Sequence, residues 1–358
     1  MLYFFKKISF ILAPIAFIMA AVSYTFDPCY IFHDLYAKSI SRSLHDGREA
    51  AVSVEFDYRS LQRYMIEGMP SRPDVVVLGS SRSMPIGEDL FKNRVFFNSS
   101  QPCGTIKDMI AIFDLYERRG MIPKTVIVEI YPWFFNRTPD PRWITLYDEY
   151  YEGLENIYRY DKIAAVKIRA ARHAFAALKY YRWLNLFYPA YFKLSSMRML
   201  AFFKEKFEER FAPDKKIKDA APCKAILSPD GSLLCSPSKE KLAGEMADRW
   251  ARDIVSSMSR MKEVDPSIKR DFDSFLSYLK RSGVEVMILL VPINPLTYDA
   301  VNSRYGGAVD YVEKEVNAIA RKDGIKEIGS YDPRKYGLKN TDFFDGVHPK
   351  RYVYEKIL

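Results

Sequence analysis

The chain alternates short aliphatic runs with segments whose apolar positions repeat at helical spacing. The run Val75–Leu78 precedes Gly79 and is typical of a strand buried on both faces of a parallel sheet. Further strands are expected at Val95–Asn98, Thr125–Ile130, Val284–Val291 and Ile325–Ile328. Helices are expected over Thr105–Arg119 and around Phe272–Leu279. This alternation predicts an α/β fold of three layers, with a central, mainly parallel sheet between helices.

A long segment interrupts the alternation between the third and fourth predicted strands. We expect residues 137–270 to form a helical insertion, and residues 73–136 and 271–358 to form the α/β domain together. The insertion interleaves aromatic and basic side chains in its first half. It could be a helical subdomain with solvated basic faces, or a cap that lines a polymer groove or rests on an anionic membrane. Residues 25–72 are predicted to be a polar stalk and lead-in.

The first residues, 1–24, are predicted to anchor the chain in a membrane as a transmembrane helix. Lys6 and Lys7 precede Ile8–Tyr24, which carries no charge and is at the short end for a spanning helix. A signal peptide cleaved near Ala21-Val22-Ser23 is the alternative. Both interpretations place the rest of the chain outside the cytoplasm. We therefore expect a single-pass membrane protein with an extracytoplasmic domain, either periplasmic or on the cell surface.

An exported location changes what the four cysteines indicate. Cys223 and Cys235 flank the turn sequence Pro229-Asp230-Gly231, so a hairpin closed by a disulfide is predicted there. Cys29 and Cys103 could pair or stay free. The sequence contains no CxxC spacing, which argues against a metal or thioredoxin-like role. We expect neither a metal nor a cofactor.

Composition narrows the choice of partners. The net charge of +9 suits nucleic acid, anionic lipid or an acidic polymer. The sequence has no zinc-finger spacing, basic-region heptads or RNA-binding aromatic signature, so nucleic acid is not expected. Aromatic residues make up 15% of the chain, and tyrosine is common on sugar-binding and membrane-interface surfaces.

The loop Gly79-Ser80-Ser81-Arg82 follows the first predicted strand. A serine at the carboxyl end of such a strand lies where backbone N–H groups converge, and these groups can stabilise an oxyanion. Taken alone, the same sequence is also common in structural turns. A serine nucleophile additionally needs a base, and the base needs a group that orients it.

The segment Asp345-Gly346-Val347-His348 could supply both groups. Gly346 permits a tight turn, so the Asp345 carboxylate could fold onto the imidazole while the other ring nitrogen faces outward to accept a proton. A plain loop capped by Asp345 is the alternative. His173 lies in the helical insertion, where a surface or packing role is expected. The candidate catalytic residues are therefore Ser81, Asp345 and His348.

The two segments resemble the first and last motif blocks of the SGNH (GDSL-type) hydrolase superfamily, which has a flavodoxin-like three-layer fold. The resemblance implies that Ser81 is the nucleophile and that its own backbone N–H helps to bind the oxyanion. The second block supplies a further donor from a glycine, and Gly104 is the matching residue.

The third block departs from that family. It normally reads Gly-x-Asn-Asp, whereas this chain reads Glu129–Asn136. Asn136 is the candidate replacement for the missing donor. Arg82 and Trp133 are expected to contact the substrate.

The altered third block and the segment Val291–Pro295 resemble those of membrane-anchored SGNH-like proteins of the DltD type, whose relatives assist O-acetylation of exopolysaccharides. This resemblance implies a tethered acyl transferase or esterase that acts on a cell-envelope or extracellular polysaccharide through an acyl-Ser81 intermediate. The implied partners are an acyl donor and an integral-membrane acyltransferase. One alternative is a catalytically silent SGNH-fold protein that binds glycan or a partner in an assembly complex. Another is a lipase or esterase of broad range. Sequence spacing does not separate transferase from hydrolase.

Overall fold

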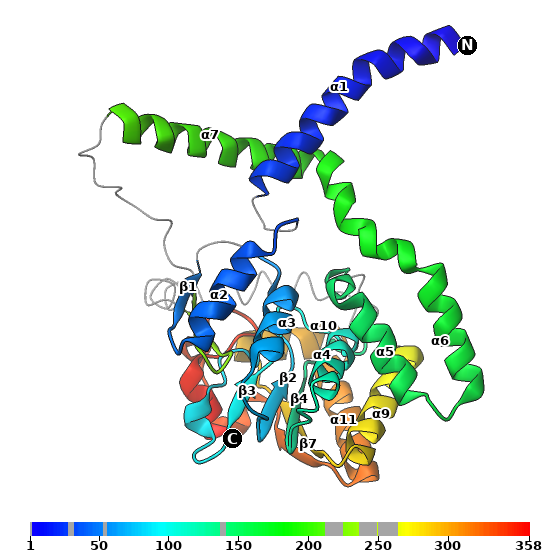
Figure 1. Ribbon diagram of the computed structural model, residues 1–358. Helices are drawn as coiled ribbons and strands as arrows, with labels where there is room; N and C mark the ends of the chain where they lie inside the picture. Colours follow the sequence, from blue (N-terminus) through cyan, green and yellow to red (C-terminus); the bar gives the residue numbers. More distant parts are fainter. Residues whose placement is uncertain are drawn as a thin grey trace.

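Five parallel strands form the centre of the structure (Figure 1). They are β2 (Val75–Leu78), β3 (Phe96–Asn98), β4 (Thr125–Ile130), β7 (Glu285–Leu290) and β8 (Lys326–Gly329). Their order across the sheet is β3-β2-β4-β7-β8, and every neighbouring pair is parallel. The expected α/β class is confirmed, and each predicted strand is present with its ends within one residue of the expected positions. The order reverses between β2 and β4, where such sheets leave a crevice beyond the carboxyl ends of their strands.

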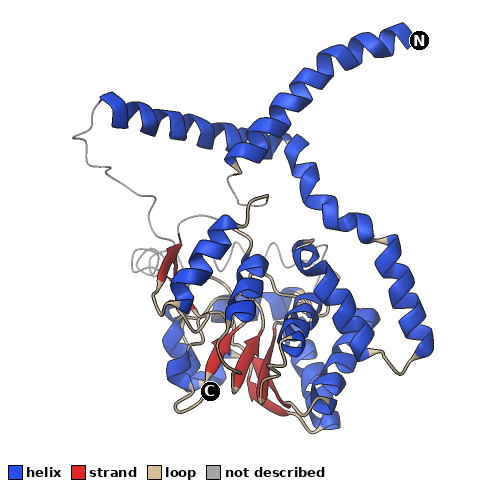
Figure 2. Cartoon of the chain, viewed as in Figure 1, coloured by secondary structure: helices blue, strands red, loops and turns tan. Residues whose placement is uncertain are grey.

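The computed structural model describes residues 2–27, 32–52, 56–136, 141–211, 225–235, 249 and 264–358. Besides the sheet, these residues form helices and short 3₁₀ segments (Figure 2). Among them are α10 (Pro295–Arg304) and the 3₁₀ segments η2 (Arg142–Leu146), η4 (Pro333–Tyr336) and η5 (Asn340–Asp342).

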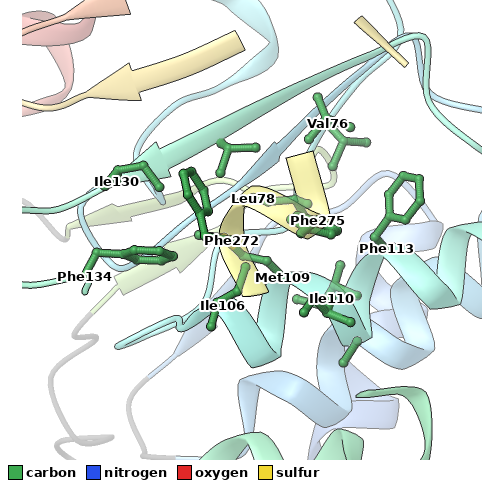
Figure 3. Packing of buried hydrophobic residues seen from close by; sticks show 14 of the residues in the cluster. Val76, Leu78, Ile106, Met109, Ile110, Phe113, Ile130, Phe134, Phe272 and Phe275 are labelled. Carbon is green, nitrogen blue, oxygen red and sulfur yellow. The ribbon is translucent and has the colours of Figure 1, made fainter. Parts of the chain in front are cut away.

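Helices cover one face of the sheet and build the larger core. They include α4 (Ile106–Arg118), α9 (Pro266–Arg281) and α11 (Ala308–Asp323). Figure 3 shows α4 and α9 side chains packed below Val76, Leu78 and Ile130 of the strands. Aromatic rings meet edge to face at Phe113 and Phe275, 6.0 Å apart. Because the strands are buried on both faces, their aliphatic runs show no polar alternation.

The opposite face of the sheet is covered by shorter segments. Val75 and Val77 point into a second, smaller cluster that contains Ile86 and Tyr354. Ile86 lies just before η1 (Glu88–Leu90), and Tyr354 belongs to η6 (Arg351–Lys356). The second outer layer is therefore thinner than the helical layer.

Residues 25–72 differ from the expected polar stalk, because much of this segment belongs to the folded body. It contains α2 (Leu35–His45), β1 (Ala50–Val52) and α3 (Tyr58–Gly68). Ile40 and Leu44 of α2 are buried in the main core, as are apolar residues of α3. Arg59 of α3 forms a buried ion pair with Asp108 of α4, with nitrogen–oxygen distances of 2.7 and 3.0 Å. Both helices are rich in polar residues, but apolar residues recur on them four positions apart. This helical pattern indicates a buried face, and the predicted stalk did not take it into account.

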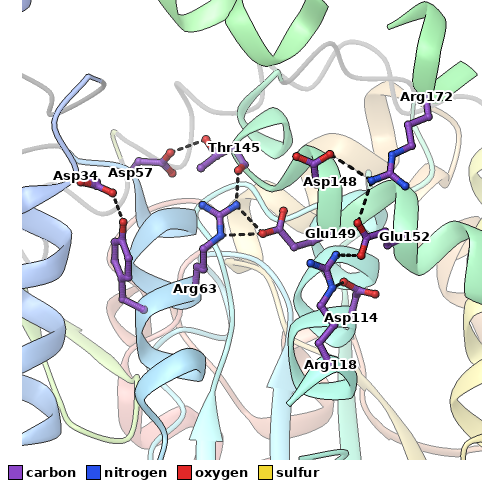
Figure 4. Close-up of polar contacts among 11 residues, drawn as sticks. Asp34, Asp57, Arg63, Asp114, Arg118, Thr145, Asp148, Glu149, Glu152 and Arg172 are labelled. Carbon is purple, nitrogen blue, oxygen red and sulfur yellow. Dashed lines mark hydrogen bonds and ion pairs between the residues drawn. The ribbon is translucent and has the colours of Figure 1, made fainter. Parts of the chain in front are cut away.

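The insertion also begins inside the body. Helix α5 (Tyr147–Ile157) packs on α4 so closely that a Cβ atom at Gly153 would lie 2.7 Å from the Ile110 side chain. Arg63 of α3 donates to Glu149 of α5 at 2.8 Å (Figure 4). Arg172 of α6 (Lys162–Ala174) contacts the acidic outer face of α5 in the same view. After α5 the described chain leaves the body, and it returns in a hairpin that pairs with β1.

These later segments are α6, η3 (Ala176–Phe187) and α7 (Pro189–Phe211), followed by a hairpin of β5 (Ala225–Leu227) and β6 (Leu233–Cys235). The hairpin is antiparallel, and β5 also pairs with β1 to make a three-stranded sheet. Cys223 lies outside the described residues, so its disulfide with Cys235 stays a prediction. Cys29 also lies outside them, while Cys103 is exposed and forms no disulfide within the described part of the chain.

The N-terminal helix α1 (Leu2–Phe26) extends away from the sheet and crosses α7 (Figure 1). The predicted transmembrane helix is not supported: among the residues that the structure describes, none of the helices is long and apolar enough to cross a membrane. Most side chains of the first eleven residues lie outside the described part of the chain.

Candidate active site

Ser81 lies at the carboxyl edge of the sheet, three residues after the end of β2. Strand β2 is one of the two strands at which the sheet order reverses, so its loop opens into the crevice where ligands bind in folds of this kind. The Ser81 side chain is partly exposed, whereas its neighbours Ser80 and Arg82 are buried. A partly exposed hydroxyl on a buried loop can meet a substrate without the loop having to unfold.

The three predicted catalytic residues come together. Ser81 Oγ lies 2.8 Å from His348 Nε2, and His348 Nδ1 lies 2.7 Å from Asp345 Oδ2. An ionised carboxylate can only accept, so Nδ1 carries the proton and Nε2 is left to accept from the serine hydroxyl. This is the arrangement that a serine nucleophile and its base require.

The turn that carries His348 is fixed by the other oxygen of Asp345. Asp345 Oδ1 accepts from the backbone N–H groups of Val347 at 2.8 Å and His348 at 2.9 Å. Burial raises the pKa of Asp345, but the His348 ring and these N–H groups outweigh it and bring the pKa to about 2. Asp345 is therefore ionised at neutral pH and holds both the position and the tautomer of the imidazole.

A buried asparagine at the end of β3, Asn98, forms hydrogen bonds to the backbone of the loop that carries Ser81. Asn98 Nδ2 donates to the carbonyl oxygens of Ser83, Met84 and Ile86, at 2.8, 3.2 and 2.8 Å. Its Oδ1 accepts from the Ser100 N–H at 2.9 Å. Asn98 thus binds three backbone carbonyls of the loop, and those of Ser83 and Met84 also accept from the N–H groups of Ile86 and Leu233.

Arg82 occupies a different place from the one expected. Its side chain is 1% exposed, so the predicted contact with substrate is wrong. The guanidinium instead donates to backbone carbonyls: to Val347 at 3.1 Å, to Pro292 at 3.0 Å and to Val291. Arg82 follows the nucleophile, Val347 precedes the base, and Val291 and Pro292 follow β7, so one side chain joins three loops of the site.

Glu129 of β4 lies beside this guanidinium. Its carboxylate is fully buried, with Oε1 at 3.9 Å from Arg82 and Oε2 accepting from the Ser80 N–H at 2.8 Å. Burial raises the pKa of Glu129, and the positive charge of Arg82 opposes that rise. Glu129 thus binds the backbone of the nucleophile loop at Ser80, and Arg82 belongs to the same loop.

Gly104 does not offer the donor expected of it. Its N–H donates to the carbonyl oxygen of Gln101 at 2.9 Å and is therefore used in a turn. The residue must nevertheless be glycine, because a Cβ atom would lie 2.2 Å from the carbonyl oxygen of Gly79. The Ser81 N–H, in contrast, has no acceptor among the described residues. It is the better oxyanion donor of the two.

The remaining predicted residues follow β4 at the same edge of the sheet. Trp133 is partly buried, with its ring 5.9 Å from the Arg82 guanidinium. Asn136 is partly exposed, and its N–H donates to the Trp133 carbonyl oxygen at 3.1 Å. The substrate contact of Trp133 and the oxyanion role of Asn136 stay predictions.

The tip of the β5–β6 hairpin also supports the site, although the sequence placed it in the insertion without such a role. The Asp230 carbonyl oxygen accepts from the Asn98 N–H at 2.7 Å, and the Leu233 N–H donates to the Met84 carbonyl oxygen at 2.8 Å. Gly231 has a φ of +80°, and a Cβ atom there would lie 2.3 Å from the Asn98 carbonyl oxygen. The Asp-Gly pair signalled a turn, but nothing in the sequence showed what the turn would contact.

Within the described residues, no three His, Cys, Asp or Glu side chains lie together in a way that could hold a metal ion. Comparison of the chain with protein-family models and with curated proteins gave no match.

Proposed function

We propose that the protein is a serine acyl transferase or esterase whose acyl group is carried by Ser81. The observation that carries the proposal is the continuous chain of contacts from Ser81 Oγ through the His348 ring to Asp345, at 2.8 and 2.7 Å. The depressed pKa of Asp345 supports it, because an ionised carboxylate stabilises the imidazolium that forms during attack.

In the first half of the reaction, Ser81 Oγ attacks the carbonyl carbon of an ester while His348 Nε2 takes the hydroxyl proton. The carbonyl oxygen becomes an oxyanion, and the Ser81 N–H is the donor available to it. The tetrahedral species then collapses and the alcohol leaves with the proton held by His348. The acyl group remains on Ser81.

In the second half, a hydroxyl from a sugar or from water attacks the acyl-enzyme. His348 removes the proton of the incoming hydroxyl and returns it to Ser81 Oγ as the ester bond to the enzyme breaks. A sugar acceptor makes the protein a transferase, and water makes it an esterase. Asp345 holds the ring in one orientation through both halves.

We propose a polysaccharide of the cell envelope or the extracellular space as the acceptor, and an extracytoplasmic, membrane-bound site of action. The resemblance of the motif blocks to exported SGNH-like proteins supports this choice. The net charge of +9 also suits an anionic polymer. An integral-membrane acyltransferase that delivers the acyl donor is part of the same proposal.

One observation favours a second candidate, a catalytically silent protein that binds glycan or a partner through the same crevice. The Gly104 N–H is engaged with Gln101, so an oxyanion would meet fewer donors than in a complete oxyanion hole. Such a protein would keep the contacts among Ser81, His348 and Asp345 without using them for turnover.

A fluorophosphonate probe separates the two candidates, because it forms a covalent bond only with an activated serine. We expect an adduct on Ser81 in the full chain, mapped by mass spectrometry, and its loss in Ser81→Ala and His348→Ala. His173→Ala is the matched control, because His173 is exposed on α6 far from the triad in sequence and should leave labelling unchanged. A folded protein that gains no adduct supports the silent binding protein instead.

A further inference from the structure

Most of the large apolar side chains that the described chain exposes lie on α1, η3 and α7. On η3 and α7 they include six residues that are between 36% and 65% exposed, namely Trp183, Leu184, Phe187, Met197, Leu200 and Phe203. We call the surface formed by these six residues the platform. Soluble surfaces rarely gather so many large apolar side chains unless something covers them.

The platform is held against the end of α1 by hydrogen bonds and ring contacts. The side chain of Asp27, at the end of α1, is buried and accepts from Tyr191 of α7 and from the His33 ring. Arg198 of α7 donates to the Asp27 carbonyl oxygen at 2.8 Å. Above this polar contact, Trp183 stacks on Tyr24 with ring centroids 6.1 Å apart. These contacts fix η3 and α7 against the end of α1.

The same segments lie apart from the rest of the molecule. Figures 1 and 2 show α7 and α1 crossing away from the central sheet, while α6 runs back toward α5. Helix α7 makes its main contacts with α1 and η3, so the sheet domain does not cover its apolar side chains. The platform is therefore accessible to a large, flat partner.

Charge indicates which partner this is. Lys193 and Lys204 of α7 are exposed among the apolar side chains of the platform. Lysine is depleted where two proteins meet, so the mixture argues against a second copy of this chain. Lysine beside tryptophan and aliphatic residues is typical of helices at a bilayer surface, where the ammonium groups reach anionic headgroups and the apolar stems stay below them.

We propose that the platform binds the surface of a bilayer that contains anionic phospholipid. Trp183 and the aliphatic side chains lie at the boundary between headgroups and acyl chains, and Lys193 and Lys204 lie at the headgroups. This inference deepens the membrane-bound site of action that we propose above, on which it rests, but it uses no residue of the triad. Its failure would leave the probe labelling of Ser81 unchanged.

The first test measures whether Trp183 enters lipid. The full chain is mixed with phosphatidylcholine vesicles that contain phosphatidylglycerol and a phospholipid brominated on its acyl chain, which quenches tryptophan at short range. We expect quenching in the wild type that is mostly lost in Trp183→Phe, a change that keeps the platform apolar. The buried Trp143 contributes little to it. Vesicle binding without quenching of Trp183 would mean that α1 alone attaches the chain, and would overturn the proposal.

The second test measures the part played by charge. Lys193→Gln/Lys204→Gln should lower the partition onto vesicles with phosphatidylglycerol by about tenfold or more, and should have little effect on vesicles of phosphatidylcholine alone. The matched control is Lys314→Gln/Lys322→Gln, which removes the same charge from exposed positions on α11. An equal loss in both double variants would show a general charge effect and would overturn the proposal.

A third measurement addresses the competing occupant. Sedimentation of the full chain without lipid, over a range of concentrations, reports whether the platform joins two copies. A dimer that Met197→Glu dissociates, in a variant that still binds vesicles like the wild type, would assign the platform to self-association and overturn the proposal. A monomer whose vesicle binding Met197→Glu weakens supports it.

Discussion

Arg82 Nε lies 3.1 Å from the carbonyl oxygen of Val347, and this hydrogen bond joins the loop of the nucleophile to the loop of the base. Ser81 and His348 sit directly beside the two joined residues. Their 2.8 Å contact therefore depends on a buried cation that touches neither of their side chains. The stability of the fold and the geometry of the triad are linked through Arg82.

Removing the charge of Arg82 should destabilise the fold and slow labelling of Ser81 together. Arg82→Met leaves Glu129 buried beside no cation, and breaking such a pair costs about 3–5 kcal/mol. Arg82→Met/Glu129→Gln should recover part of this loss, because no unpaired charge remains. Urea unfolding and the rate of fluorophosphonate labelling measure the two effects. Arg334→Met, at an exposed position, is the control. Equal unfolding midpoints for Arg82→Met and wild type would contradict the role given to the pair.

Replacing Asn98 should lower the stability of the fold through the loop that carries Ser81. Asn98→Ala removes the donor shared by three carbonyls of the nucleophile loop, and should lower the free energy of unfolding by about 3 kcal/mol. Asn98→Asp should be worse, since a carboxylate would face carbonyl oxygens with no proton to offer. Urea unfolding ranks the two variants. The reverse ranking would show that lost packing, and not lost hydrogen bonds, explains the effect.

Gly104→Ala should disturb the site although we assign Gly104 no donor role. The new Cβ atom would lie 2.2 Å from the Gly79 carbonyl oxygen, so the two loops must separate. We expect labelling of Ser81 to slow by tenfold or more. Cys103→Ala changes the neighbouring, exposed residue and should label like the wild type. If Gly104→Ala keeps the wild-type rate, the close approach of the loops is not needed for activity.

Asp345 should make stability depend on pH in the acid range. Its pKa in the fold, about 2, is below the value of about 3.9 expected for the unfolded chain. Ionised Asp345 therefore stabilises the fold above about pH 4, and this contribution is lost as the pH falls toward 2. Asp345→Asn keeps an oxygen for the backbone N–H groups but has no charge to lose. The free energy of unfolding should fall less steeply in this variant between about pH 5 and pH 2.

The control for this measurement is Asp299→Asn, which changes an exposed carboxylate on α10. Its pH dependence should match that of the wild type. If Asp345→Asn also matches the wild type, the charge of Asp345 is not coupled to folding.

The parts of the site that could be predicted from the sequence are those with a local signal. The aliphatic run of β2 ends at Gly79, so the position of Ser81 at the edge of the sheet followed from that pattern. Asp345 and His348 are three residues apart, and a turn with glycine brings them together without help from the rest of the fold. The meeting of these two segments was a hypothesis from residue chemistry, and the 2.8 Å contact agrees with it.

The misplaced residues depend on contacts that no local pattern contains. Arg82 is charged and next to the nucleophile, which suggested a substrate contact, but the carbonyls that bury it come from loops more than two hundred residues away. Gly104 fitted a motif position, but its N–H donates to Gln101 in a turn, and it lies too close to the Gly79 carbonyl oxygen to carry a side chain. The polar residues of α2 and α3 hid apolar faces that pack on the core.

Ser81 and His348 are separated by 267 residues, and this distance decides when the protein becomes reactive. During synthesis β2, β3 and α4 emerge before the segment that carries Asp345 and His348, so the nucleophile exists for a time without its base. Contacts across so long a span are slow to form, because the loop between them must close first. The triad is therefore incomplete until the chain beyond His348 has been made and this span has closed. A chain that stalls or is cut before η5 lacks Asp345 and His348 and has no means to acylate Ser81.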